Sequence, residues 1–382
     1  MIRSSLLSMS AVALLAIAAL PVFAGNGGDQ DRPIVPQLTA TPTQSVSTVP
    51  QNGDINPYGV AFVPRDFPRG GPLRPGDILV ANFNASDNAQ GTGTTIVSVS
   101  PDGTQSLFYQ NAATPGLSTA LGVLKRGLVL VGNLPSLDAS GVCTESNGEE
   151  TDVGQGSLTI IDRHGRVMKT LTSAKFLHGP WDLTIRDNSD TASVFVSDAL
   201  SGSVARIDLR LVDDDHDGDV DRVIVENQTI IASGYVHRCD PAAFVVGPTG
   251  VVLDEDTDTL YVASTGDNAI FAVHDATNRH SDAGTGQLIT SDPVHLHGPL
   301  GLTRSRNGDL ISAQGDAVNP DPNQVSELVE FTANGKFVAE VEVDPNGGSA
   351  FGLALKSFEN GDGFVFAAVD DFLNVLKIWV VQ

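Results

Sequence analysis

The chain has little positive charge: 22 Lys and Arg residues stand against 46 Asp and Glu residues among 382, which gives a formal net charge of −24. Proteins that bind nucleic acid use clustered basic residues to neutralise phosphates, so this composition argues against a nucleic-acid partner. The excess of acidic residues favours solubility and is compatible with binding of divalent cations or cationic partners.

Long apolar runs are also scarce, and the one at the N-terminus is typical of a signal peptide. Arg3 supplies a positive start, residues 6–20 are rich in Ala and Leu, and residues 22–24 resemble a signal-peptidase site. The run is too short for a membrane span, and no Cys follows it to carry a lipid anchor. We expect removal of residues 1–24, a flexible lead-in at residues 25–38, and export to the periplasm or the extracellular space.

Cysteine is nearly absent, since Cys143 and Cys239 are the only two. In an oxidising compartment such a pair indicates one disulfide, and two free thiols are the alternative. The sequence also lacks a nucleophile elbow, a phosphate-binding glycine loop and a metalloprotease helix, so no motif identifies a reaction. Trp is rare, and both Trp181 and Trp379 lie in strand-like phrases, which favours packing over sugar binding.

What the sequence does contain is a phrase repeated six times: an apolar pair around Gly, a turn rich in Asp, Asn or Gly, and a β-rich stretch that ends in a polar residue. The copies are centred on Gly59, Gly122, Asp182, Gly250, Gly301 and Gly352, at spacings of 63, 60, 68, 51 and 51 residues. Spacings of this length suit four-stranded blades with loops of different lengths. The repeat therefore predicts an all-β fold, a six-bladed β-propeller over residues 39–382.

Blade four shows the phrase most clearly, with alternating strand-like segments at residues 250–254, 259–264 and 269–273. Together with the stretch from Gly247 to Thr249 and the turn from Gly266 to Asn268, these segments resemble the NHL-type repeat of six-bladed propellers. The resemblance covers nearly all of the mature chain. It implies a broad group that also includes gluconolactonase-like and streptogramin-lyase-like proteins, in which one fold hosts hydrolases, lyases and binding modules.

Blade six has only three strand-like segments before the chain ends. Residues 45–49 have the alternation of the missing outer strand, so we expect them to pair with the last blade. This closure joins the two ends of the chain, and it predicts that trimming past residue 50 opens the ring.

The position that closes the second strand is polar in every blade. The six residues, which we call the polar ring, are Asn82, Asn133, Asp198, Ser264, Gln314 and Asp370. In a propeller this position opens onto one face, here called the top face, near the central channel. The polar ring is therefore a candidate ligand-binding site, with Asp198 and Asp370 as candidate general bases. The alternative is that each residue caps its strand end by bonding loop amides.

Two His residues precede inner strands at matching positions, His178 in blade three and His297 in blade five. With Asp54 of blade one they would suit a divalent metal such as zinc at the channel mouth. The alternative is that both His residues cap blade junctions through hydrogen bonds.

The family resemblance bears on this metal site. Peptidyl-hydroxyglycine lyases, which are similar propellers, hold zinc with three His residues, and here a third matched His is missing. Gluconolactonase-like hydrolases use calcium with a Glu, an Asn and an Asp. Members of the polar ring match the last two, Asn82 or Asn133 with Asp198 or Asp370, and no Glu completes the set.

The strongest local motif lies elsewhere, at residues 213–221, where Asp213, Asp215, Asp217, Asp219 and Asp221 alternate around Gly218. Alternating carboxylates with a Gly at the sharp turn wrap oxygen ligands around calcium, although the Glu of an EF-hand is replaced by Ile224. Strand-like segments on both sides place this loop at a hairpin tip on the bottom face. We expect a structural calcium there, and a solvated acidic turn is the alternative.

The sequence thus predicts an exported propeller that binds a small molecule or a protein on its top face, with calcium in one hairpin. The alternative is a metal-dependent hydrolase, lactonase-like, or a lyase with its site at the channel mouth. The ligand, the reaction and the oligomeric state are not encoded in these patterns.

Overall fold

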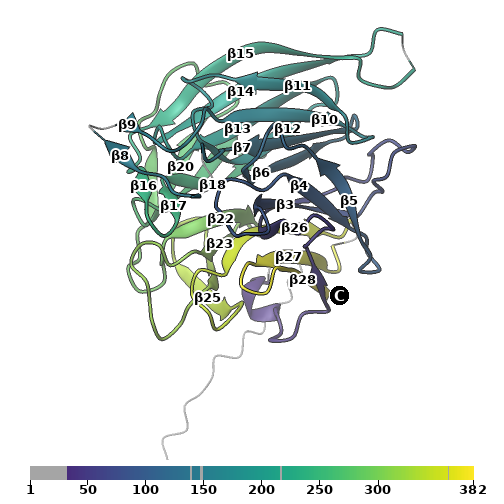
Figure 1. The fold of residues 1–382 in the computed structure, drawn as a ribbon. Coiled ribbons are helices and arrows are strands. Elements are labelled where there is room, and N and C mark those ends of the chain that lie inside the picture. Colours follow the sequence, from purple (N-terminus) through teal and green to yellow (C-terminus); the bar gives the residue numbers. More distant parts are fainter. Residues whose placement is uncertain (1–31, 138–139, 147–148, 216, 360) are drawn as a thin grey trace, which may run out of the picture.

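The computed structural model describes residues 32–137, 140–146, 149–215, 217–359 and 361–382. Over these ranges the protein consists of six antiparallel four-stranded sheets arranged around a central axis (Figure 1), so the predicted six-bladed β-propeller is confirmed. The predicted signal peptide lies outside the described residues. No helix in the described ranges is long and apolar enough to cross a membrane.

Each blade runs outwards from the axis through four strands. Blade one comprises β2 (Ile55–Phe62), β3 (Ile78–Asn84), β4 (Thr95–Val99) and β5 (Gln105–Gln110). Blade two comprises β6 (Leu117–Leu124), β7 (Leu128–Asn133), β10 (Ser157–Asp162) and β11 (Val167–Thr172). Blade three comprises β12 (Pro180–Asp187), β13 (Thr191–Asp198), β14 (Ser203–Val212) and β15 (Arg222–Ser233).

The second half of the ring repeats this order. Blade four comprises β18 (Pro248–Asp254), β19 (Thr259–Ser264), β20 (Ala269–His274) and β21 (Gln287–Thr290). Blade five comprises β22 (Pro299–Arg304), β23 (Leu310–Gln314), β24 (Glu327–Phe331) and β25 (Phe337–Glu342). Blade six comprises β26 (Ala350–Ser357), β27 (Phe364–Asp370), β28 (Val375–Val381) and β1 (Gln44–Ser47). The first strands of neighbouring blades contact one another all the way round, so they form the channel wall.

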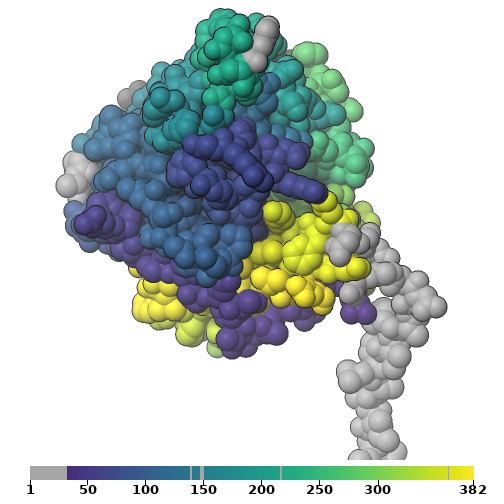
Figure 2. Space-filling model, turned by 90° about the vertical axis from the view of Figure 1, so that its right-hand side faces the viewer, coloured from purple at the N-terminus to yellow at the C-terminus, as the bar shows by residue number. Residues whose placement is uncertain are grey.

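The outer strand of blade six comes from the N-terminus, as predicted. β1 pairs antiparallel with β28, from Gln44 opposite Ile378 to Ser47 opposite Val375. Figure 2 shows the consequence on the surface, where N-terminal residues in purple pack beside C-terminal residues in yellow. The pairing completes the four-stranded sheet of the last blade and covers the edge of β28.

A short 3-10 helix, η2 (Val35–Gln37), forms a second N-terminal contact that the sequence did not suggest. The buried carboxylate of Glu330 accepts hydrogen bonds from the amides of Ile34 (2.9 Å) and Val35 (2.8 Å). Ile34, Val35 and Leu38 are buried in the apolar cluster of blades five and six. The described end of the predicted lead-in is therefore packed against the propeller.

The repeated phrase coincides with a register shift in the inner strand of every blade. At this point the strand passes close to its neighbour. A Cβ on Gly352 would lie 1.6 Å from the carbonyl oxygen of Tyr58, and one on Gly250 would lie 2.3 Å from that of Leu300. The recurrent Gly is therefore explained by the close approach of adjacent blades.

Apolar side chains fill the space between each pair of blades. Six clusters lie between neighbouring blades, and a seventh lies at the top of the channel, with Tyr58, Phe83, Trp181 and Phe244 among its members. Burial of this kind contributes about 25 cal/mol per Å² of apolar surface. The ring is held together by these inter-blade cores, and the aromatic cluster closes its top.

Two short ribbons extend the top face. They are formed by β8 (Glu145–Ser146) with β9 (Glu149–Glu150) and by β16 (Arg238–Asp240) with β17 (Phe244–Val246). In Figure 1 both ribbons lie on the left, and the tip of the β14–β15 hairpin projects on the right. The acidic hairpin tip and the ribbons are therefore at opposite ends of the propeller.

Candidate functional site

The polar ring is buried at the top ends of the second strands, with exposed fractions between 0% and 3%. Asp198 accepts hydrogen bonds from the amides of His178 (2.6 Å) and Gly179 (2.9 Å). Gln314 Oε1 accepts the equivalent bond from the amide of His297 (2.8 Å). In both blades the side chain fixes the segment that leads into the inner strand, which is the behaviour of a cap.

The remaining members of the polar ring are also bonded within the protein. Asn82 Nδ2 donates to Thr48 O (3.0 Å), Asn133 Nδ2 to Pro115 O (3.1 Å) and Ser264 Oγ to Asp267 Oδ2 (2.6 Å), and Asp370 Oδ2 pairs with Lys377 Nζ (2.6 Å). The polar ring thus supports the top-face loops. Its contact with a ligand, and the role of Asp198 and Asp370 as bases, stay predictions.

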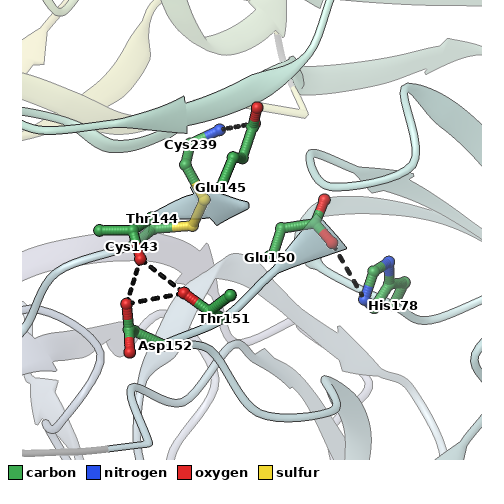
Figure 3. Close-up of a disulfide and its surroundings, with 8 residues drawn as sticks. All are labelled: Cys143, Thr144, Glu145, Glu150, Thr151, Asp152, His178 and Cys239. Atoms are coloured by element: carbon green, nitrogen blue, oxygen red, sulfur yellow. Dashed lines mark hydrogen bonds and ion pairs between the residues drawn. A yellow bond between two sulfur atoms is a disulfide. The ribbon is translucent and has the colours of Figure 1, made fainter. Parts of the chain in front are cut away.

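The two matched His residues differ in their surroundings. His178 Nε2 lies 4.0 Å from Glu150 Oε2 (Figure 3). The ring of His297 is buried, and its nitrogens lie 2.6 Å and 3.1 Å from the carbonyl oxygens of Asn319 and Val294. Both ring nitrogens of His297 therefore lie against backbone carbonyl oxygens.

Asp54, the third predicted zinc ligand, is also buried. One of its oxygens accepts hydrogen bonds from the amide and hydroxyl of Thr94 and from the hydroxyl of Thr95. In the described part of the chain, only Asp213, Asp215 and Asp221 bring three acidic, His or Cys ligand atoms within 4.8 Å of one another. The structure does not bring His178, His297 and Asp54 together.

The acidic hairpin tip does gather carboxylates. Asp213, Asp215 and Asp221 each place an oxygen within 4.8 Å of the others. The amide of Gly218, whose φ is +96°, donates to Asp213 Oδ2 at 3.0 Å. Asp219 instead pairs with Arg163 of blade two. Three of the five predicted calcium ligands thus converge, and His216 of the same loop lies outside the described residues.

The predicted disulfide between Cys143 and Cys239 is present (Figure 3). It joins the long β7–β10 loop of blade two to β16, and the amide of Cys239 also donates to Glu145 Oε1 at 2.6 Å. The chain between β16 and β17 carries Ala242 and Ala243, which line the pocket described next. The disulfide therefore anchors one wall of that pocket.

A pocket of about 400 Å³, the mouth pocket, opens on the top face where loops of five blades and the β16–β17 ribbon meet. Its aromatic members are Tyr58 of β2, Trp181 of β12 and Phe351 of β26. The ring of Tyr58 stacks on Phe351 at 4.5 Å between centroids and meets Trp181 edge-on at 5.7 Å. These rings separate the mouth pocket from the channel below.

The polar lining of the mouth pocket is rich in amides and carboxyls. It consists of Asn56, Asn84, Asn88, Gln90, Thr265, Asp316 and Asp371. Within the described ranges, four buried polar atoms of lining residues have no hydrogen-bond partner: Asn56 Oδ1, Asn84 Oδ1, Trp181 Nε1 and Asp316 Oδ1. An unsatisfied buried polar atom costs roughly 1–3 kcal/mol, so such a concentration calls for a bound partner.

The pKa values of both carboxyls in the lining are raised, so these groups ionise less readily than exposed acids. Burial, with the charge of neighbouring Asp370, raises the pKa of Asp371 to about 7. Burial also raises the pKa of Asp316, against hydrogen bonds from the amides of Ser326 and Gly348. Burial and the charge of Asp371 raise the pKa of the Tyr58 hydroxyl as well. Shifted carboxyls in a cavity are typical of functional sites.

Backbone strain is concentrated in the same lining. Asn56, Asn88 and Asp316 have φ values of 59°, 63° and 57°, and Phe244 of the adjoining ribbon has a φ of 65°. Asn and Asp tolerate this left-handed region, whereas an aromatic residue rarely adopts it. Strained residues of this kind cluster at ligand sites because the surrounding fold holds them in place.

The sequence patterns identified the polar ring but not the mouth pocket. Asn84 and Asp316 stand two residues after ring members Asn82 and Gln314, and Asp371 follows Asp370 directly. The available signal was therefore the polarity of the loop residues just beyond each ring position.

No family model matches the chain, and no curated protein matches its sequence. Solved structures resemble it in fold. A luciferin-regenerating enzyme is 10% identical with a TM-score of 0.45, over 89% of this chain and 95% of that chain. A calcium-binding protein, regucalcin, from Agrobacterium tumefaciens is 12% identical with a TM-score of 0.45, over 87% and 92%. The NHL-type repeat itself remains a resemblance.

Proposed function

We propose that the protein binds a small organic molecule in the mouth pocket. The observation that carries the proposal is the set of four buried, unpartnered polar atoms among the described lining residues, on Asn56, Asn84, Trp181 and Asp316. A ligand with complementary donors and acceptors removes their desolvation penalty, and the aromatic rings bury its apolar part. Export through the predicted signal peptide is part of this proposal.

The test is a fragment screen by ligand-observed NMR on the mature protein. We expect hits that the variant Ala317→Trp abolishes, because Ala317 lines the pocket and the indole fills it. Leu107→Trp, on an exposed outer strand, is the matched control and retains binding. Hits that persist in Ala317→Trp would place the site elsewhere.

A second candidate is hydrolysis of an ester or lactone in the same pocket. It is favoured by Asp371, whose pKa of about 7 suits a general base that accepts a proton from the attacking water near neutral pH. Within the described residues the pocket does not gather three acidic, His or Cys metal ligands, so the candidate is argued from Asp371 alone.

A panel of γ- and δ-lactones and aryl esters tests hydrolysis. We expect Asp371→Asn to lower kcat by about 100-fold or more while ligand binding persists, which is the usual effect of removing a general base. Asp87→Asn, an exposed acid in a loop of the same face, serves as the control. An activity that survives Asp371→Asn would exclude this carboxyl as the base.

We also propose a structural calcium at the β14–β15 hairpin tip. The support is the convergence of Asp213, Asp215 and Asp221, together with the buried Asp213 Oδ1, which has no partner among the described residues. Calcium prefers such oxygen ligands, and without a cation the carboxylates repel one another.

Thermal unfolding with and without calcium tests this site. Calcium is expected to raise Tm in the unmodified protein and in Asp256→Asn, a control in another acidic turn, but not in Asp215→Asn. Equal calcium responses in all three proteins would refute the hairpin site.

A further inference from the structure

The described residues that line the mouth pocket include two carboxyls, Asp316 and Asp371, and no Lys, Arg or His. Proteins bind phosphate and carboxylate groups through such cations, so an anionic ligand would find no counter-charge here. The lining therefore disfavours an anionic ligand.

Both carboxyls belong to the same wall, where blades five and six meet. Asp316 Oδ2 accepts a hydrogen bond from the amide of Gly348 at 3.2 Å, and the amide of Asp371 donates to the carbonyl of Ser349 at 2.9 Å. Because these contacts fall on consecutive residues of one segment, the two acids flank that segment. The negative charge of the pocket is thus concentrated on one side.

Further titratable groups stand behind this wall. Glu327 is 1% exposed, and burial with the charge of Asp316 raises its pKa to about 7. Asp370 is paired with Lys377. His297 favours the charged forms of Asp316 and Glu327, but its ring is bonded to backbone carbonyls and does not line the pocket. Of these groups, only Lys377 and His297 are basic, against four carboxyls.

The remainder of the lining suits the apolar part of a cation. Tyr58, Trp181 and Phe351 provide aromatic surface, which attracts ammonium groups through the negative potential of the ring faces. Trp181 and Asn84 are each 1% exposed, and each has a polar atom without a partner in the described structure. These two atoms point to a ligand independently of the acidic wall.

We propose that the ligand of the mouth pocket is a small organic cation, an ammonium compound whose charge faces Asp316 and Asp371 and whose carbon groups contact the aromatic rings. The proposal rests on the function proposed above and specifies its ligand class. The formal net charge of −24 also raises the local concentration of cations around the protein.

The experiment compares a cation with its neutral isostere by ligand-observed NMR on the mature protein. Choline is tested against 3,3-dimethylbutan-1-ol, which replaces the quaternary nitrogen by carbon, and calcium chloride is tested separately. We expect choline to bind at least about tenfold more tightly than the alcohol. The preference should disappear in Asp316→Asn/Asp371→Asn and persist in Asp87→Asn.

Each other outcome overturns the ligand class. Equal binding of choline and the alcohol, or binding of neutral fragments only, would show that the pocket does not select cations. The proposed function, binding of a small organic molecule, would then stand without this ligand class. Displacement of choline by calcium at equimolar concentration would make the acidic wall a metal site. Failure of every fragment and of choline would remove the function and the inference together.

Discussion

The carboxylate of Asp182 in blade three accepts a hydrogen bond from the amide of Val251 in blade four at 3.0 Å. The other five blades have Gly at the position of Asp182. Its second oxygen accepts a bond from the amide of Leu183 at 2.8 Å, and the side chain lies in the wall of the central channel. In blade three, therefore, a carboxyl bonds the inner strand to that of blade four. In the other blades Gly at this position allows the backbones to approach closely.

The burial of Asp182 makes stability depend on pH. Burial raises the pKa of Asp182 from its usual 3.8 to about 7, so between these values the folded state holds a proton that the unfolded state has lost. The stability contributed by this group is thus complete below pH 3.8 and declines as pH rises towards 7. The shift corresponds to an upper limit of about 4 kcal/mol.

We expect Asp182→Asn to remove this decline, because the amide mimics the neutral acid at every pH. From pH 4 to pH 8 the unfolding free energy of the variant should therefore rise relative to that of the unmodified protein. Urea denaturation at each pH measures this difference. Asp256→Asn, in an exposed turn, should show no such trend. A difference that is constant with pH would contradict the assignment.

Cation binding should follow the ionisation of Asp371. Its pKa of about 7, raised by burial and by Asp370, means that the carboxylate form becomes dominant above neutral pH. Choline affinity should therefore rise from pH 6 to pH 8, and it should rise less in Asp371→Asn. Titration calorimetry in buffers of different ionisation enthalpy would detect the accompanying proton release. A profile identical in both proteins would exclude Asp371 from the response.

Loss of the disulfide should affect both stability and the pocket. Cys143 and Cys239 are separated by 96 residues, and removal of a bridge across a loop of this size costs about 2–5 kcal/mol. We expect Cys143→Ser/Cys239→Ser to unfold at lower urea and to bind fragments more weakly, because the bridge anchors the wall that carries Ala242 and Ala243. The unmodified protein under reducing conditions should match the variant, and unchanged binding would separate the disulfide from the pocket.

The contact of η2 with Glu330 should contribute to stability independently of β1. Deletion of residues 25–38 removes the burial of Ile34 and Val35 and leaves the Glu330 carboxylate without its two amide donors. We expect a loss of roughly 3 kcal/mol or more in urea unfolding. Adding Glu330→Gln to the deletion should recover part of this loss, because it removes a buried charge. No loss on deletion would show that the segment is dispensable.

The sequence predicted those parts of the molecule that recur from blade to blade. The phrase around Gly59 and Gly250 marks a backbone approach that each blade must make, so alignment of the copies revealed it. Pairing of residues 45–49 with blade six followed from counting strands. The disulfide followed from an even Cys pair in a chain that is expected to be exported.

The mouth pocket was missed because most of its residues do not recur from blade to blade. Asn84 and Asp316 share a position two residues after the polar ring, whereas Asp371 lies one residue after it, and only the closed ring brings them to one opening. The partners of Glu330 were missed for a related reason: the amides that it binds belong to a Pro-containing segment nearly 300 residues away, where composition suggested a flexible lead-in.

The pairing of β1 with β28 also sets the order in which the molecule can be completed. β1 precedes the strands of all six blades in the chain, and β28 follows the other described strands. Blades one to five can form their sheets as they emerge, but β1 has no partner until β28 has been made. The inter-blade cores on both sides of blade six then form together, so ring closure follows the synthesis of β28 and depends on a pairing between strands far apart in the sequence.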